Sequence, residues 1–172
     1  QGLLAEISAS FINATLANID QKIDAMLERC GEFLKVDRTF LFQLSEDCTL
    51  MSNTHEWSSP GIPSVKDDVQ NYPVADVPLI EKTICAQEML FIPDVSELSE
   101  AWSAEKRELE RQQVRSVLCL PLIKGGRFLG YFGFDAVRAT KQLDDETVEV
   151  LKILANTLAD ALESNRIEKE DR

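Results

Sequence analysis

The chain has 172 residues, of which 44% are hydrophobic, a length and composition typical of one globular domain with a substantial core. Its formal net charge of −12 argues against nucleic acid and anionic lipid as partners, because both are bound through basic surfaces. The longest apolar run, Val117 to Ile123, is far shorter than the roughly 20 residues that cross a bilayer, so no membrane insertion is expected.

The cysteines indicate the cellular compartment of the chain, and its two ends indicate that it is part of a longer protein. No cysteine has the paired spacing or the nearby histidines of a disulfide framework or zinc site, which favours reduced thiols in a cytoplasmic domain; the cysteines are Cys30, Cys48, Cys85 and Cys119. The chain begins at Gln1 without Met and ends in helical composition. We therefore expect residues 1–172 to be one domain that was cut from a longer, multidomain protein.

The N-terminal segment predicts one long helix over residues 2–30, because its apolar residues recur at alternating steps of three and four. The main seam consists of Ala5, Ala9, Ile12, Leu16, Ile19, Ile23, Met26 and Cys30, and a second stripe of Leu4, Ile7, Phe11 and Ala14. Gly31 is placed where such a helix could end. Two stripes are more than one sheet face needs, so the pattern favours a homodimer formed through this helix and the C-terminal one.

The middle of the chain alternates short strands with loops. Strands are predicted at Arg38–Leu44 and Thr49–Trp57, followed by the loop 58–78, which holds four of the six prolines and has the length of a functional lid or wall. Asp76 is expected to cap a short helix that continues through Ile84. A strand at Met89–Val95 and a charged helix at Ser99–Gln113 come next.

Residues 115–138, RSVLCLPLIKGGRFLGYFGFDAVR, predict two strands joined by a Gly125-Gly126 turn. Counting back from a two-residue turn places Ser116 opposite Asp135 and Leu118 opposite Gly133, on the face that also holds Tyr131. This face is polar and poor in side chains at one end, as a small-molecule pocket requires. A plainer interpretation stays open, in which Asp135 only caps a turn and Gly133 marks a bulge.

The last segment predicts another long helix, with the acidic run Asp144-Asp145-Glu146 in its first turn and a Leu-rich stripe after it. Five antiparallel strands bracketed by long helices make an α+β domain.

In order along the chain, several segments resemble the GAF domain family of bacterial signalling proteins: VDRTFLFQLSED (36–47), SNTHEW (52–57), IPDV (92–95), VRSVLCLPLIKGGRFLGYFGFD (114–135) and the Leu-rich helix that starts LDDETVEVLK. The resemblance covers residues 20–165. It implies an antiparallel sheet of five to six strands, with the terminal helices on one face and small helices and loops over a pocket on the other. It also implies an output domain in the same polypeptide, of the histidine kinase or the cyclic-di-GMP enzyme type.

The family also limits which cofactors to expect. Cyclic-nucleotide-binding members carry an Asn-Lys pair and then Phe-x-x-x-Asp-Glu; here Asp145-Glu146 is present, but Lys141 stands at the Phe position and no Asn-Lys occurs. Bilins attach to a Cys that typically has an adjacent His, a pair absent here, and haem would need an axial ligand although His55 is the only histidine. We therefore set all three aside and leave the ligand unidentified, with an anion or a metabolite in view.

The resulting expectation is a non-enzymatic regulatory module that senses a small molecule and signals through its terminal helices. The residues expected at its ligand site are Ser116, Leu118, Gly133, Asp135 and Tyr131, with Arg115 at the rim and Trp57, Tyr72 and Trp102 as walls or lid. One alternative is a dimerisation and relay module without a ligand. A remoter one is a free methionine sulfoxide reductase, which is also GAF-like but needs reactive cysteines, whereas residues 103–114 contain none.

Overall fold

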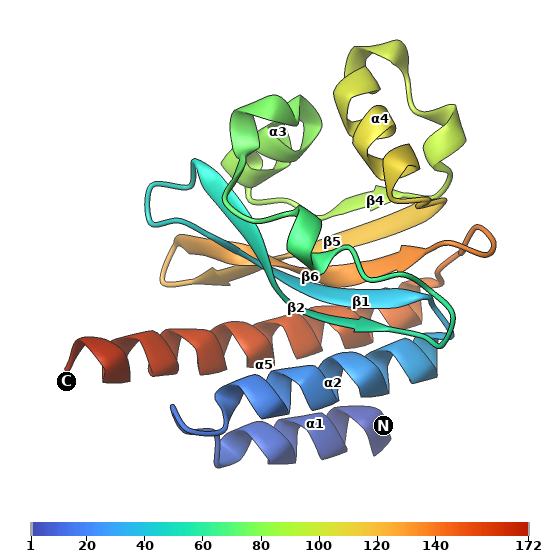
Figure 1. Ribbon diagram of the computed structural model, residues 1–172. Coiled ribbons are helices and arrows are strands. Elements are labelled where there is room, and N and C mark those ends of the chain that lie inside the picture. Colours follow the sequence, from blue (N-terminus) through green and yellow to red (C-terminus); the bar gives the residue numbers. More distant parts are fainter. Residues whose placement is uncertain (1, 172) are drawn as a thin grey trace.

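A computed structural model describes residues 2–171 as an antiparallel sheet between two layers of helices (Figure 1). The sheet has six strands in the order β3-β2-β1-β6-β5-β4. The strands are β1 (Arg38–Leu44), β2 (Leu50–Ser58), β3 (Tyr72–Pro73), β4 (Leu90–Ile92), β5 (Ser116–Lys124) and β6 (Arg127–Ala136). The α-helices are α1 (Gly2–Ile12), α2 (Ile19–Leu34), α3 (Pro78–Ala86), α4 (Ser103–Arg111) and α5 (Asp145–Glu170).

The two helical layers differ in size, as Figure 1 shows. The long helices α1, α2 and α5 cover one face of the sheet, while α3, α4 and the loop between β2 and α3 lie over the other. That loop contains the short 3-10 helices η1 (Lys66–Asp68) and η2 (Val74–Asp76); η3 (Val95–Glu97) and η4 (Glu100–Trp102) precede α4. The predicted α+β arrangement is confirmed. Along residues 2–171, no helix combines the length and apolar character needed to cross a membrane.

The N-terminal segment is a helical hairpin, so the prediction of one helix over residues 2–30 is wrong. The chain leaves the helix after Ile12 and re-enters it at Ile19, and the Thr15 backbone N–H donates to the Asn18 side chain at 2.7 Å in the intervening turn. Polar residues with low helix propensity in this turn favour the break. α1 then folds back along α2 and packs against α5.

This hairpin accounts for the second apolar stripe of the N-terminal segment. The side chains of Leu3, Ile7 and Phe11 are buried in the core that the long helices form with the sheet. The second stripe is therefore buried within one chain and gives no argument for a dimer, whereas Ala5, Ala9 and Ile12 of the main seam are exposed. The dimer itself stays a prediction.

Gly31 lies inside α2 and does not end it. The helix continues to Leu34, and Lys35 takes the left-handed conformation (φ 57°) that ends it. A Cβ on Gly31 would come within 2.1 Å of the Trp57 ring on β2, so glycine is needed here for close packing of the helix on the sheet.

The pairing of β5 with β6 contains a bulge that changes which side chains share a face. Lys124 pairs with Arg127 across the Gly125-Gly126 turn, as predicted, and Ile123 pairs with Phe128. Leu122 then pairs with Gly130, so Leu129 is an extra residue on β6. Side chains alternate between the two faces of a sheet, so this one-residue shift changes which β5 and β6 residues share a face. The β5 residues from Leu122 back to Ser116 therefore lie on the face opposite to the one predicted by counting from the turn without a bulge.

We predict that Leu158→Ala, in the middle of α5, lowers the free energy of unfolding by about 2–5 kcal/mol, because it leaves a cavity in the core. Leu158 is fully buried between α5 and the sheet. The neighbouring exposed position provides the control, and Asn156→Ala should change stability by no more than about 0.5 kcal/mol. Urea denaturation measures both, and similar effects for the two variants would contradict the assigned face of α5.

Candidate functional site

A cavity of about 90 Å³ lies between the sheet and the layer of α3, α4 and the 58–78 loop. The strands contribute its floor, while Val65, Val69 and Val77 from the loop region contribute to its wall. The long proline-rich loop is therefore a wall of the cavity. The residues that line the cavity are Phe40, Phe42, Met51, Asn53, Glu56, Val65, Val69, Tyr72, Val77, Ile80, Leu90, Ile92, Glu105, Glu108, Leu109, Gln112, Val117, Cys119, Tyr131 and Asp135.

The structure places three of the predicted site residues at this cavity. Tyr131 and Asp135 line it from β6, and Tyr72 lines it from β3. The Tyr131 hydroxyl forms a hydrogen bond of 2.6 Å with the hydroxyl of Thr83, which links the sheet floor to α3. We call α3, α4 and the 58–78 loop the roof of the cavity. The prediction that Tyr131 and Asp135 of β6 point toward this side of the sheet is correct.

The β5 residues predicted for the same face lie elsewhere, because of the bulge at Leu129. Leu118 is fully buried in the core under the long helices, and Val117 and Cys119 face the cavity instead. Ser116 pairs with Ala136; its hydroxyl donates to the Pro93 carbonyl at 2.7 Å and accepts from the Lys141 N–H at 2.9 Å. Ser116 thus connects the segments at Pro93 and Lys141 and does not line the cavity.

Gly133 has a structural explanation within the sheet. It pairs with Cys119, and a Cβ at this position would lie 1.7 Å from the backbone oxygen of Leu118. The missing side chain is thus required by the close approach of β5, and no ligand is needed to account for it.

The remaining predicted site residues lie away from the cavity. Trp57 packs against the helical core on the other side of the sheet. Trp102 stands in the roof, where the Lys82 ammonium is 5.6 Å from its ring centroid, a cation–π contact between η4 and α3. The exposed Arg115 guanidinium donates to the Arg138 carbonyl at 3.2 Å.

A buried arginine that sequence reasoning missed bonds to two residues that line the cavity, Asp135 and Gln112. Arg38, at the start of β1, is 1% exposed. Its guanidinium donates to the Asp135 carboxylate at 3.2 Å, to the Pro63 carbonyl at 3.0 Å and to the Gln112 carbonyl at 3.0 Å. One side chain thereby joins the sheet, the 58–78 loop and the end of α4. Burial raises the pKa of Asp135 to about 6, although Arg38 opposes the shift and Glu56 and Asp37 add to it.

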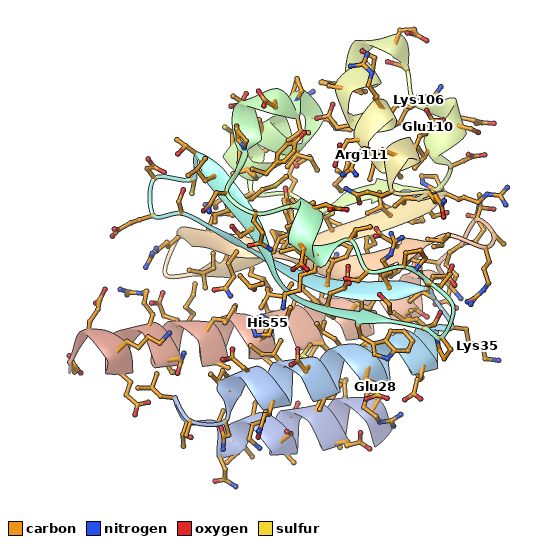
Figure 2. The ribbon with its side chains drawn as sticks, viewed as in Figure 1. Glu28, Lys35, His55, Lys106, Glu110 and Arg111 are labelled. Atoms are coloured by element: carbon orange, nitrogen blue, oxygen red, sulfur yellow. The ribbon has the colours of Figure 1, made fainter. Side chains whose placement is uncertain are left out.

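Glu105 of α4 is a second buried charged residue that the sequence did not reveal. Its carboxylate oxygen Oε2 accepts from the backbone N–H groups of Leu79 at 2.6 Å and Ile80 at 3.3 Å, in the first turn of α3. The predicted cap, Asp76, does not cap α3. Nothing in the alternating charges of α4 singles Glu105 out, since the neighbouring α4 residues labelled in Figure 2, Lys106 and Glu110, are charged too.

Cys119 of β5 and His55 of β2 lie on opposite sides of the sheet. Burial raises the pKa of the Cys119 thiol far above its usual range, so it stays protonated and is a poor nucleophile. His55 lies on the helix side of the sheet (Figure 2), where its ring nitrogens are 2.8 Å from Asp20 and 2.9 Å from Thr54.

The charged residues that line the cavity are all acidic: Glu56, Glu105, Glu108 and Asp135. Among the described lining residues there is no Lys, Arg or His side chain. An anion, considered from the sequence, would meet repulsion here, whereas a positively charged group would be attracted.

Comparisons with known proteins place this architecture. The GAF domain family model matches residues 18–162. A curated relative, the methanogenesis regulatory histidine kinase FilI of Methanothrix harundinacea (strain 6Ac), is 26% identical over 168 residues, which make up 95% of this chain but only 19% of that protein.

Two solved structures share the fold over nearly the whole chain. The phycocyanobilin-bound GAF domain from a cyanobacterial phytochrome has a TM-score of 0.79 at 16% identity, covering 97% of this chain and 95% of that chain. The phycoerythrobilin-bound GAF domain from a cyanobacterial phytochrome has a TM-score of 0.77 at 15% identity, covering 98% of this chain and 96% of that chain. At these identities the likeness establishes the fold alone.

These structures overturn the sequence-based expectation about cofactors. Bilins were set aside because no Cys here has an adjacent His, yet both structures are bilin-bound domains of the same fold. The absence of an adjacent Cys-His pair is therefore not sufficient to set bilins aside for this fold.

We predict that Asp135 makes the stability of the domain depend on pH. With a folded pKa of about 6 against an ordinary value of 3.8, its contribution to stability is fully present below the ordinary value and is lost as the pH rises through about 6. The difference in unfolding free energy between wild type and Asp135→Asn should therefore shift in favour of wild type by about 1–2 kcal/mol from pH 7 to pH 4.5. Urea denaturation at constant ionic strength measures it; a difference that is constant, or that shifts the other way, would contradict the assignment.

Proposed function

Since the chain belongs to the GAF domain family, we propose that it is a regulatory module that binds a small molecule in the roofed cavity and passes the event through its long helices to an output domain of the same polypeptide. It acts as a sensor and not as an enzyme, and a cytoplasmic setting suits its free cysteines.

The observation that carries this proposal is the cavity itself. Its walls are largely apolar and it holds a few buried polar groups, which is the chemistry of small-molecule sites. The roof above it is joined to the sheet through single side chains such as Arg38 and Thr83. A ligand below can therefore change how the roof and sheet fit together.

A route from the cavity to the helices follows from the alternation of side chains along β5. Val117 and Cys119 line the cavity, while Leu118 and Leu120 between and beside them are fully buried against the long helices. A shift of this strand on ligand binding must move both sets, because a close-packed core transmits strain. α5, which packs on β5, is the element that would carry the signal out of the domain.

The output domain is proposed from the curated relative. That protein is a regulatory histidine kinase, and this chain matches about a fifth of its length. Of the two output types expected from the sequence, this relation favours the kinase. A reductase activity has less support, because the cysteine at the cavity, Cys119, is buried and its raised pKa keeps the thiol protonated.

A second candidate function, a dimerisation and relay module, is favoured by apolar side chains that α5 exposes. Ile153 is 49% exposed and Ile167 is 47% exposed, on the helix that would carry the signal. Burying such side chains between two copies is a common source of dimer stability. The two functions are compatible, because a sensor can relay its signal through a dimer.

We predict that the purified domain retains a small molecule in native mass spectrometry and that Leu109→Trp abolishes this retention, because Leu109 lines the cavity and a larger ring would fill it. Arg107→Trp, on an exposed position of the same helix, is the matched control and should keep the ligand. A visible absorption band in the wild type would identify a bilin. A ligand-free wild type, or retention by Leu109→Trp, would contradict a ligand site in this cavity.

We predict that the double variant Ile153→Ser/Ile167→Ser weakens self-association by about tenfold or more, through loss of buried apolar area. Lys152→Ser/Lys169→Ser changes neighbouring exposed positions of the same helix and should leave self-association unchanged. Sedimentation equilibrium measures both. A monomeric wild type, or equal weakening by the two variants, would argue against a dimer through α5.

A further inference from the structure

We infer that the ligand of this cavity is a compact organic cation, a protonated amine with a small apolar body, and that it binds through the Oε1 atom of Glu105. The inference rests on the proposed function, since it names the chemical class of the molecule that the cavity takes.

Glu105 carries an unmet hydrogen-bonding group at the cavity. The residue is 2% exposed and lines the cavity from α4. Its Oε2 atom accepts two backbone N–H groups of α3, but its Oε1 atom is buried and has no hydrogen-bond partner. A buried carboxylate oxygen without a donor is costly, so a ligand that supplies one gains the free energy that the empty site lacks.

The other three lining carboxylates already have donors within the protein. Asp135 accepts from Arg38, and Glu108 accepts from Arg111 and Gln112. Glu56 accepts from the Ser64 hydroxyl and the Val65 N–H. Of the lining carboxylates in residues 2–171, only Glu105 has a fully buried oxygen left without a partner.

Charge and size narrow the class of ligand further. Four acidic groups line the cavity, and two of them, Asp135 and Glu108, are paired with Arg38 and Arg111. Glu56 and Glu105 form no ion pair among the described residues, so a cation is favoured over a neutral molecule and an anion is opposed. The volume of about 90 Å³ suits a few heavy atoms; for comparison, an apolar cavity of about 150 Å³ holds benzene. A single ammonium group on a short, branched apolar chain meets both limits.

Glu105 also connects such a ligand to the roof. The same carboxylate would bind the ammonium through Oε1 and the N-terminus of α3 through Oε2. Because α3 and α4 are joined by this carboxylate, a bound cation would stabilise their present arrangement over the sheet. Binding of a cation at Glu105 would therefore affect directly how α3 and α4 are positioned over the sheet.

The test uses three Y-shaped probes of four heavy atoms each and different charge: isopropylamine, 2-propanol and acetate, titrated at pH 7 and followed by amide NMR chemical shifts. The wild type should bind the amine about tenfold or more tightly than the alcohol, as a charged hydrogen bond implies, and should bind the carboxylate most weakly. Glu105→Gln keeps an oxygen for the α3 cap and should lose the preference for the amine. Glu110→Gln removes the same charge from an exposed position of α4 (Figure 2) and should keep it.

Each result decides the matter. Equal binding of the amine and the alcohol by the wild type, a preference for the carboxylate, a bilin as the native ligand, or an unchanged preference in Glu105→Gln would overturn the cation while leaving a small-molecule site in place. No binding of any probe would overturn the cation, and a ligand-free domain in native mass spectrometry would overturn the proposed function as well. The wild-type order of affinities remains a test if Glu105→Gln fails to fold.

Discussion

The buried guanidinium of Arg38 is the interaction on which the enclosed cavity depends. It bonds to a carboxylate of the sheet, a carbonyl of the 58–78 loop and a carbonyl at the end of α4, so the floor and two parts of the roof meet at one side chain. Removing one partner of such a buried pair leaves an unpaired charge and costs about 3–5 kcal/mol. An apolar contact could supply similar stability, but it would not specify which three segments come together. Arg38 therefore determines where the roof sits.

The sheet separates two hydrophobic cores, and only the one on the roof side contains a cavity. On the helix side, Leu118, Leu120 and Leu122 of β5 pack with Phe132 and Phe134 of β6 into a continuous apolar layer. On the roof side, the packing is interrupted by the cavity and by buried acidic groups. The stable layer holds the strands in place, and the interrupted layer leaves room for a ligand. One strand with alternating side chains serves both, which is the physical basis of the proposed signal path.

Sequence reasoning predicted the fold well because the fold depends on local patterns. β1 was placed at its observed bounds, Arg38–Leu44, and the acidic start of α5 at Asp144 is a true helix cap. It failed where one residue changes the geometry. The extra residue Leu129 in β6 reversed the faces of β5, so Leu118 was assigned to the pocket in place of Cys119. The turn before Ile19 likewise divided a helix whose periodicity continued unbroken across it.

By itself, the sequence determined most of the order of helices and strands, the family and the general layout of a roofed sheet, because periodicity, turn residues and the succession of motifs can be read along the chain. Only the tertiary structure decided the site. The bond from Arg38 to Asp135 joins residues 97 positions apart, and the bond from Glu105 to Leu79 joins residues 26 positions apart. Such pairs have no local signal, since many charged residues of this acidic chain could have been partners. Tertiary packing brought these two pairs together and buried them. Burial matters because charged groups interact more strongly away from water.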